Sequence, residues 1–433
     1  MIFPSRDDQP FLKGVGEKLL TKLTMSSKAT NRELVKKIAQ KISRDEVSKL
    51  LSDFVKVPSV TGAEGNAARF LEEWCKKNGL PCELQQVEGD RYNVIVKLEG
   101  TTGKSTIHFD GHIDTYPMTD EWDKNLVGKI SKDRVYGIGS VDDKGGTVAM
   151  LIAAKAILEL REHPEGNIVL TAVPGHLEGG SGVRKLVEKG FKADVGIVCE
   201  PTTMKLINCH MASLYFEIVT RGIPALDTYK ENGVNAILHM TRIIDELQNL
   251  ERTYQKKYKH PVLGVPLVNI GKINGGFRHN IVPDECHLAF SIRYLPGQTT
   301  EGIKKEIQQI FVRLKREEIH DLDASISYLK GWYDWPRLPL EVHKNSQLVR
   351  SVAQAYENVT GKVPMITGEK YWTDASIFTS AGIPSVVFGP GNDECYWIDE
   401  YMETDQLQNA ARIYAMLMQE MTSLSREELL KGT

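Results

Sequence analysis

The sequence predicts an α/β protein in which a main domain, with a mostly parallel sheet covered by helices on both faces, is interrupted by a smaller α+β domain. Short β-branched runs alternate with helical stretches between residues 50 and 205. A strand–helix–strand–strand–helix–strand order follows between 210 and 325, and the first pattern returns near the C-terminus. The interrupted alternation therefore predicts two domains, one split by the other.

In the main domain, runs rich in β-branched residues predict strands, and apolar residues at helical spacing predict the helices between them. The strands are Asn93–Lys97, Thr106–Phe109, Ile168–Ala172 and Val195–Val198, and the helices are Ala67–Lys77, Gly146–Leu160 and Gly182–Lys189. A helix near 345–358, a strand at Ser385–Phe388 and a final helix complete the domain. We place the main, metal-binding domain at 45–209 and 330–433.

The inserted segment, 210–329, has the element order of a small ferredoxin-like domain. Its predicted strands are Leu214–Thr220, Val268–Lys272, His287–Tyr294 and Asp323–Leu329, and its predicted helices are Asn235–Leu250 and Glu301–Lys315. Residues 1–44 are charged and lysine-rich, with helical spacing of apolar residues. We expect them to form an N-terminal extension with a solvated surface helix, not a targeting segment.

Composition excludes several classes of protein. The chain has 433 residues, and 54 Lys and Arg against 57 Asp and Glu give a net charge of −3, so a nucleic-acid partner is not expected. The sequence has no run of 18 apolar residues, so no membrane span is expected either. The 6 cysteines are scattered and form no CxxC motif, which predicts reduced thiols and a cytoplasmic protein.

Three motifs carry polar residues to the ends of predicted strands. The first, FDGHIDTYP at 109–117, places His112 at a sheet edge with Asp114 two residues on, which is the pattern of a metal-binding histidine oriented by a carboxylate. The second, YGIGSVDDKGG, holds Asp142 in a turn before a helix, and the third, CEPTT, holds Glu200 after an apolar strand. Alone, each has another interpretation: a histidine satisfied by its neighbour, a helix N-cap or a solvated strand end.

In combination and order, these motifs resemble the zinc-dependent amidohydrolase and exopeptidase family of acetylornithine deacetylase, succinyl-diaminopimelate desuccinylase, aminoacylase and carboxypeptidase G. The resemblance covers nearly all of residues 45–425. It extends to the segments VPGHLEGGSG, GGFRHNIVPDEC, FSIRYLPG, TDASIF and FGPG. It implies a zinc-exopeptidase-like fold whose inserted domain is a lid that forms a homodimer, and hydrolysis of an amide bond in an N-acyl amino acid or peptide-like substrate.

The resemblance also implies roles for individual residues. His112, Asp142 and Glu200 would bind a zinc ion, and Asp114 would orient His112. The lid residues Asn280 and Arg293 would contact the substrate, and Gly391 would lie in a loop that lines the substrate.

The sequence departs from the family pattern in the segment that supplies the general base and a ligand to a second metal. In the register that preserves the glycines, His176 takes the position of the base and Leu177 that of the ligand. A shift by one residue would make Glu178 the ligand but breaks the spacing to Gly179. His176 is then either a replacement base, since imidazole suits proton transfer at neutral pH, or a remnant without a role.

Further departures affect the lid and the C-terminal ligand. The lid histidine is replaced by Leu226, the C-terminal ligand by Tyr396 or, in a shifted register, Trp397, and an arginine by Ile138. Together with Met211 these changes predict a more apolar pocket.

A second metal would keep too few ligands, so we expect at most one zinc ion per chain, or none. Three functions stay open at this point. The chain is a hydrolase with altered or impaired activity, a catalytically silent binding protein, or a metal-free esterase, natural or engineered, in which Cys209 and His176 form a thiol–imidazole pair. An inert buried thiol is the other interpretation of Cys209.

Overall fold

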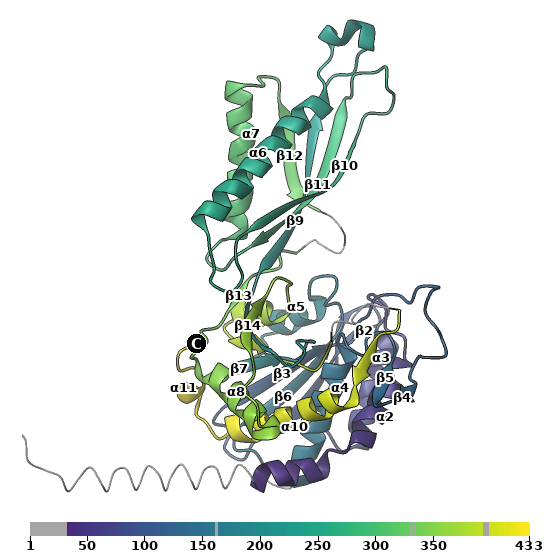
Figure 1. The fold of residues 1–433 in the computed structure, drawn as a ribbon, viewed down its shortest axis with the longest axis vertical. Coiled ribbons are helices and arrows are strands. Elements are labelled where there is room, and N and C mark those ends of the chain that lie inside the picture. The colour runs from purple at the N-terminus through teal and green to yellow at the C-terminus, as the bar shows by residue number, and fades with distance from the viewer. Residues whose placement is uncertain (1–32, 161–162, 330, 332–334, 393–397) are drawn as a thin grey trace, which may run out of the picture.

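The computed structural model describes residues 33–160, 163–329, 331, 335–392 and 398–433. Figure 1 shows two bodies joined by neighbouring chain segments: a main domain built around a broad sheet, and a lid in which two long helices lie along a second sheet. Each body has its own hydrophobic core. The chain thus folds into a main domain, built from two separate segments, and a lid.

The main sheet has nine strands in the described part of the chain, in the order β1-β2-β6-β3-β7-β15-β8-β13, with β14 also paired to β8. Its strands are β1 (Cys82–Glu88), β2 (Arg91–Leu98), β3 (Thr106–His112), β6 (Asn167–Val173), β7 (Val195–Val198), β8 (Leu206–His210), β13 (Leu340–Glu341), β14 (Ile366–Glu369) and β15 (Ser385–Val387). The central strands β6, β3, β7 and β15 pair in parallel, whereas β1 and β2 are antiparallel. Their fully buried apolar residues are typical of strands covered on both faces.

Helices cover both faces of the main sheet because successive connections between its parallel strands run in opposite directions across it. The connection from β3 to β6 contains α4 (Lys144–Leu160), and the return from β6 to β7 contains α5 (Ser181–Glu188). Since right-handed crossovers are the rule, these two helices lie on opposite faces. The other helices are α2 (Arg44–Val55), α3 (Gly65–Lys77), α8 (Gln347–Thr360), α9 (Ala375–Ser380), α10 (Thr404–Met421) and α11 (Arg426–Leu429), and β4 (Ile130–Ser131), β5 (Arg134–Tyr136) and β16 (Tyr401–Glu403) form a small separate sheet.

The lid is a four-stranded antiparallel sheet in the order β10-β11-β9-β12 with two helices packed on it. Its elements are β9 (Ala212–Arg221), α6 (Ala236–Lys257), β10 (Leu267–Gly275), β11 (Glu285–Tyr294), α7 (Thr300–Glu317) and β12 (Asp323–Tyr328). Asn235 and Thr299 cap the two helices by accepting hydrogen bonds from backbone N–H groups of the first turn. The predicted order of elements is confirmed.

The main domain begins earlier than residue 45. Residues 33–41 are helical, and Ile38 and Ile42 are buried in the main core, so this part of the predicted extension is not a solvated helix. The reason is its apolar stripe, which packs against the domain. Residues 1–32, like Tyr396 and Trp397, lie outside the described part. None of the helices that the structure describes is both long and apolar enough to span a membrane.

Candidate active site

The carboxyl ends of three adjacent parallel strands bring the predicted histidine and carboxylate together. His112 ends β3, Glu200 follows β7 by two residues, and His176 lies in the turn after β6. Because parallel strands end at one edge of a sheet, these side chains converge although up to 88 residues separate them (200 minus 112). All three are buried, with relative exposures of 1%, 4% and 7% for His112, Glu200 and His176.

Carboxylates fix the ring of His112 on both sides. Its Nδ1 lies 3.0 Å from the backbone oxygen of Asp114 and 3.3 Å from that residue's carboxylate, and its Nε2 lies 3.0 Å from Oδ1 of Asp142. Hydrogen bonding at Nδ1 leaves Nε2 as the nitrogen that can bind a metal. The expected pairing of His112 with Asp114 agrees with this geometry.

Asp114 also shapes the turn that carries His176. Its carboxylate accepts hydrogen bonds from the backbone N–H groups of His176 and Leu177, at 3.0 and 3.1 Å. Burial opposes the ionisation of Asp114, but its hydrogen bond to His112 and these N–H groups hold its pKa below the ordinary value. One ionised carboxylate thus links the β3 and β6 ends.

His176 lies in the middle of a ring stack. Its imidazole stacks on His112, with ring centroids 4.5 Å apart, and on Trp372, at 5.2 Å. Its Nδ1 lies 3.0 Å from Oδ2 of Asp374, within hydrogen-bonding geometry, and 3.2 Å from Oε1 of Glu200. His176 therefore contacts the other groups at the site directly.

Three side chains come close enough to bind one metal ion. They include the predicted ligands His112 and Glu200, but His176 stands in place of Asp142. Single donor atoms of His112, His176 and Glu200 all lie within 4.8 Å of one another. Asp142 borders this group through its contact with His112. The donor group therefore consists of His112, Glu200 and His176.

The site concentrates acidic groups in a buried space. Burial and the nearby carboxylates of Asp142 and Asp374 raise the pKa of Glu200 to about 7, in spite of the neighbouring histidines. Burial lowers the pKa of His176, but Glu200 and Asp374 outweigh that effect and raise it to about 9. Burial also raises the pKa of Asp143. A bound cation would relieve this crowding of negative charge.

Glu400 supports the turn that carries Asp142. Its Oε1 accepts hydrogen bonds from the backbone N–H groups of Val141 and Asp142, at 2.7 and 3.3 Å. Burial raises the pKa of Glu400 to about 7. A carboxylate from the C-terminal part of the chain therefore positions a turn more than 250 residues earlier (400 minus 142).

Glu178, the ligand in the shifted register, is not among the three donors that come together. Its carboxylate forms an ion pair with Arg91 at 2.6 Å, and Arg91 also donates two hydrogen bonds of 2.8 Å to the buried Glu64. Arg91 is the first residue of β2, so its guanidinium ties Glu178 to that strand. The register that places His176 and Leu177 at the two family positions is consistent with this geometry.

Cys209 lies in a different environment from the one a nucleophile needs. It is packed with Met211, Leu263 and Leu295 in a small apolar cluster, and burial raises the pKa of its thiol to about 11. Among the described residues, the partners of the His176 ring are His112, Trp372, Glu200 and Asp374, without Cys209. The arrangement favours the inert buried thiol.

The predicted substrate residues lie in separate places. Gly391 is next to the site, because a Cβ there would meet Pro201 at 2.6 Å. Asn280 and Arg293 belong to the lid, and no hydrogen bond or ion pair between described residues joins them to the main domain site. The replaced positions also separate: Leu226 is exposed on the lid, and Met211 lies in the cluster with Cys209.

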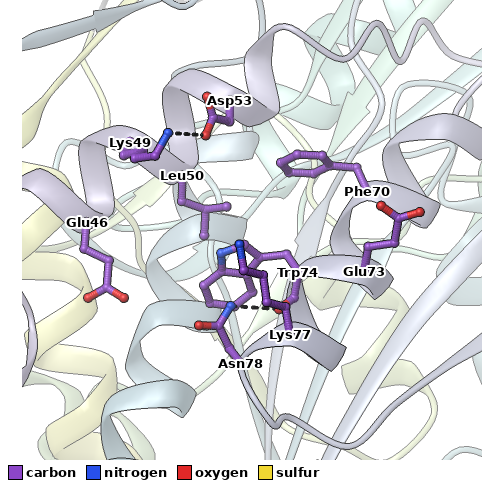
Figure 2. A pocket seen from close by; sticks show the side chains of 9 residues that line it. All are labelled: Glu46, Lys49, Leu50, Asp53, Phe70, Glu73, Trp74, Lys77 and Asn78. Carbon is purple, nitrogen blue, oxygen red and sulfur yellow. Dashed lines mark hydrogen bonds and ion pairs between the residues drawn. The ribbon is translucent and has the colours of Figure 1, made fainter.

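The main domain contains two cavities that bear on the question of a substrate site. One, of about 510 Å³, lies beside the Asp142 turn and is lined mostly by apolar groups: Tyr116, Pro117, Thr119, Glu121, Trp122, Ile138, Ile398 and Glu400. Figure 2 shows the other, of about 370 Å³, between α2 and α3, where Leu50, Phe70 and Trp74 are surrounded by Lys and Glu side chains. Only the first shares a residue, Glu400, with the site.

Sequence reasoning missed Asp374, Trp372 and Glu400 as members of the site. Asp374 and Glu400 lie in segments that resemble the family, TDASIF and the segment before Tyr401, so their positions were visible but their partners were not. Trp372 has no signal in the sequence beyond its nearness to Asp374.

Comparison with known proteins agrees with this geometry. The chain is 28% identical over 409 residues to a probable succinyl-diaminopimelate desuccinylase of Staphylococcus aureus, covering 84% of this chain and 94% of the relative. It is 28% identical to an acetylornithine deacetylase of Buchnera aphidicola, over 86% and 96% of the two chains, and 23% identical to an N-formyl-4-amino-5-aminomethyl-2-methylpyrimidine deformylase of Halalkalibacterium halodurans, over 84% and 92%.

Solved structures share the fold. The aminopeptidase PepT of Bacillus cereus superposes with a TM-score of 0.72 at 20% identity, over 89% of this chain and 100% of that one. A metallo-carboxypeptidase of Sulfolobus solfataricus gives 0.69 at 20% identity, over 88% and 100%. The profile of peptidase family M20/M25/M40 matches residues 108–420, which span both halves of the main domain and the lid. The chain belongs to peptidase family M20/M25/M40.

Proposed function

We propose that the protein is a metal-dependent hydrolase that cleaves an amide bond in an N-acyl amino acid or peptide-like substrate, with a single zinc ion per chain. The observation that carries this proposal is the buried group of His112, His176 and Glu200, whose donor atoms lie within 4.8 Å of one another. Membership of the family and the deacylase and peptidase names of the relatives support the reaction class.

The donor set suits such an ion. Two histidines and one glutamate are the protein ligands of several single-zinc hydrolases, which leave a fourth position open. In addition, Oε1 of Glu200 is buried and accepts no hydrogen bond from the described residues, although Nδ1 of His176 lies 3.2 Å away, so a bound cation would satisfy this oxygen. These two points support His112, His176 and Glu200 as the ligands.

Around the ion, the residues of the chain have separable roles. A bound zinc would polarise the scissile carbonyl and lower the pKa of a bound water. Asp114 fixes the ring of His112, so Nε2 keeps its lone pair toward the site. Asp142, 3.0 Å from that nitrogen, is the carboxylate that accepts the proton of the attacking water and returns it to the leaving amine. His176 serves here as a ligand and not as the base.

This assignment has a consequence for rate. A general base contributes about 10²–10⁴-fold, and Asp142 supplies it from a position that also contacts His112. Because only one ion would polarise the substrate, we propose an activity below that of relatives with a dinuclear site.

The apolar cavity beside Asp142 supports a substrate with an apolar group. Trp122 and Ile138 contribute to a lining that is mostly hydrophobic, as in many small-molecule sites. We propose that the acyl chain or an apolar side chain of the substrate lies there.

Assembly and location are further parts of the proposal. The edge strand β10 exposes Leu267 and Ile273, which supports a homodimer formed through the lid. The described cysteines are all free, which supports a reducing compartment such as the cytoplasm.

Metal analysis combined with an activity assay tests the function. We expect about one zinc ion per chain, and hydrolysis of a panel of N-acyl amino acids and dipeptides that is lost in chelator and restored by zinc. Glu200→Gln should lose the ion, whereas Glu178→Gln, whose carboxylate pairs with Arg91, should keep it. Hydrolysis that persists after complete metal removal contradicts the proposal, as does a purified chain that binds no zinc.

A further inference from the structure

The carboxylate of Asp374 is a second buried acid in contact with a histidine of the site, and neither the proposed ligands nor the proton transfer uses it. Asp374 is the N-cap residue of α9 and is 1% exposed. Its Oδ2 lies 3.0 Å from Nδ1 of His176, and its Oδ1 accepts no hydrogen bond from the residues described. A buried carboxylate with a single partner is costly unless that contact has a purpose.

The pair of Asp374 and His176 repeats the arrangement of Asp114 and His112. In both, a buried carboxylate meets Nδ1 of the ring, at 3.0 Å from the distant Asp374 in the first pair and at 3.3 Å from Asp114, two residues after His112, in the second. Glu200 is also 3.2 Å from Nδ1 of His176, but its Oε1 does not meet hydrogen-bonding geometry. The proton of Nδ1 is therefore shared with Asp374, which leaves Nε2 of His176 as the nitrogen that can bind a cation.

Two other contacts hold Asp374 and the ring in register. The backbone N–H of Thr373, next to Asp374, donates to Nε2 of the buried His210 at 3.2 Å. Trp372 stacks on His176 and donates from Nε1 to Ser376 on the same helix start, at 2.8 Å. The segment 372–376 is thus fixed to β8 at one end and to the imidazole at the other.

We infer that Asp374 is a positioning residue for the metal site: it holds the Nδ1 proton and the ring orientation of His176 so that the other ring nitrogen binds the cation. The inference rests on the proposed function, because it requires His176 to be a ligand. It extends the site beyond its ligands to an acid on α9.

Zinc affinity tests the inference without any need for turnover. The full-length protein is stripped of metal, and the dissociation constant for zinc is measured by competition with a chromophoric chelator. Asp374→Ala removes the acceptor and should weaken zinc binding about 10–100-fold, and Asp374→Asn, which keeps an oxygen of the same size, should lie between that variant and the wild type. The exposed Asp405, which pairs with Arg44, provides the control Asp405→Asn, which should bind zinc as the wild type does.

A double-mutant cycle separates positioning from a general effect on structure. If Asp374 acts through His176, adding Asp374→Asn to His176→Gln causes no further loss of zinc affinity; if it acts on the fold alone, the two losses add. Additive losses, or zinc binding by Asp374→Ala as tight as in the wild type, overturn the inference. If Asp374→Ala does not fold, Asp374→Asn and the cycle decide. A wild type that binds no zinc contradicts the proposed function itself, which distinguishes the two failures.

Discussion

The guanidinium of Arg91 joins the carboxylates of Glu64 and Glu178, and Glu64 is fully buried. Whether a buried carboxylate already has a cationic partner decides whether it can bind a metal ion or transfer a proton. An acid paired with a fixed cation is already neutralised, whereas Glu200 and Asp374 each keep a buried oxygen without a hydrogen bond among the described residues. The same residue type is thus paired with a guanidinium at position 178 and, in our proposal, with a cation at position 200.

Replacing Arg91 tests the structural role. Arg91→Met leaves Glu64 as a buried charge without its partner, so we expect a loss of about 3–5 kcal/mol in the free energy of unfolding, measured by urea titration at neutral pH. Arg69→Met removes an exposed ion pair with Asp90 and should cost about 0–1 kcal/mol. Equal losses in the two variants would show that the buried pair is not special.

Ile138 tests the proposed substrate cavity. Ile138→Arg introduces a charge into a mostly apolar lining of about 510 Å³. We expect kcat/KM for substrates with long apolar groups to fall about 10-fold or more, with a smaller change for N-acetyl substrates, in steady-state assays over a series of acyl lengths. A uniform change over the whole series would place the apolar group of the substrate elsewhere.

At the scale of single residues, the family resemblance named His112 and Glu200, whose donor atoms lie close together, but it gave His176 no partner. Asp142 came only with the resemblance, whereas His112 and Glu200 stand at the ends of predicted strands, so their nearness at one sheet edge was predictable. The partner of His176 was not, because Asp374 lies 198 positions later and the contact depends on how α9 packs. The choice between a reactive and an inert thiol at Cys209 stayed open for a similar reason: apolar neighbours from other segments set its pKa.

Among the elements, long and periodic ones were predictable and short ones were not. The strands β3 and β6 and the helices α4 and α7 follow the predicted ranges to within a few residues. By contrast, β1 is mostly polar and lies at the edge of the sheet. The strand β13 has only two residues, and it forms by pairing with β8, which is distant in sequence. Local sequence carries no strong signal for such strands.

Helix α10 provides a prediction at this scale. Its Glu420 is largely buried, and burial raises its pKa to about 7, so the folded state holds a proton that the unfolded state releases near pH 4.5. Stability should therefore fall as the pH rises from 4.5 to 7, and the penalty should be complete above pH 7. Glu420→Gln removes this penalty and should raise the free energy of unfolding at pH 8 by about 1–3 kcal/mol, with little change at pH 4.5.

Denaturant titrations at the two pH values check this expectation. The exposed Glu427 nearby provides the control, since Glu427→Gln should have the same small effect at both. A Glu420→Gln variant that gains nothing at pH 8 would mean that water reaches the carboxylate in the folded state.

For the whole molecule, the lid has a hydrophobic core separate from that of the main domain. Its edge strand is where our proposal places the contact between two copies of the chain. The strand β10 is at the edge of the lid sheet, and Leu267 and Ile273 are 38% and 49% exposed. The division into domains was predictable from the change in element order, because each order is typical of a different fold. The position of the lid relative to the site was not predictable, because local sequence patterns carry little information on contacts between domains.

The proposed dimer gives the prediction at this scale. We expect sedimentation equilibrium to show a dimer at micromolar concentration, and a double variant of Leu267→Lys and Ile273→Lys to be a monomer, because charge on an edge strand opposes pairing. Val312→Lys, on the exposed face of α7 with 66% exposure, is the matched control and should stay dimeric. A monomeric wild type would contradict the proposal.

The split of the main domain has a consequence for how the chain folds during synthesis. The lid is continuous in sequence, so it has all its residues as soon as segment 210–329 leaves the ribosome. The main domain does not, because α10, which packs against α2, α4 and α8, is made only after the lid (Figure 1). Until then α4, apolar on nearly all sides, lacks its cover. The half-made main domain is therefore a part of the nascent chain that needs chaperone protection, although its first half is translated before the lid.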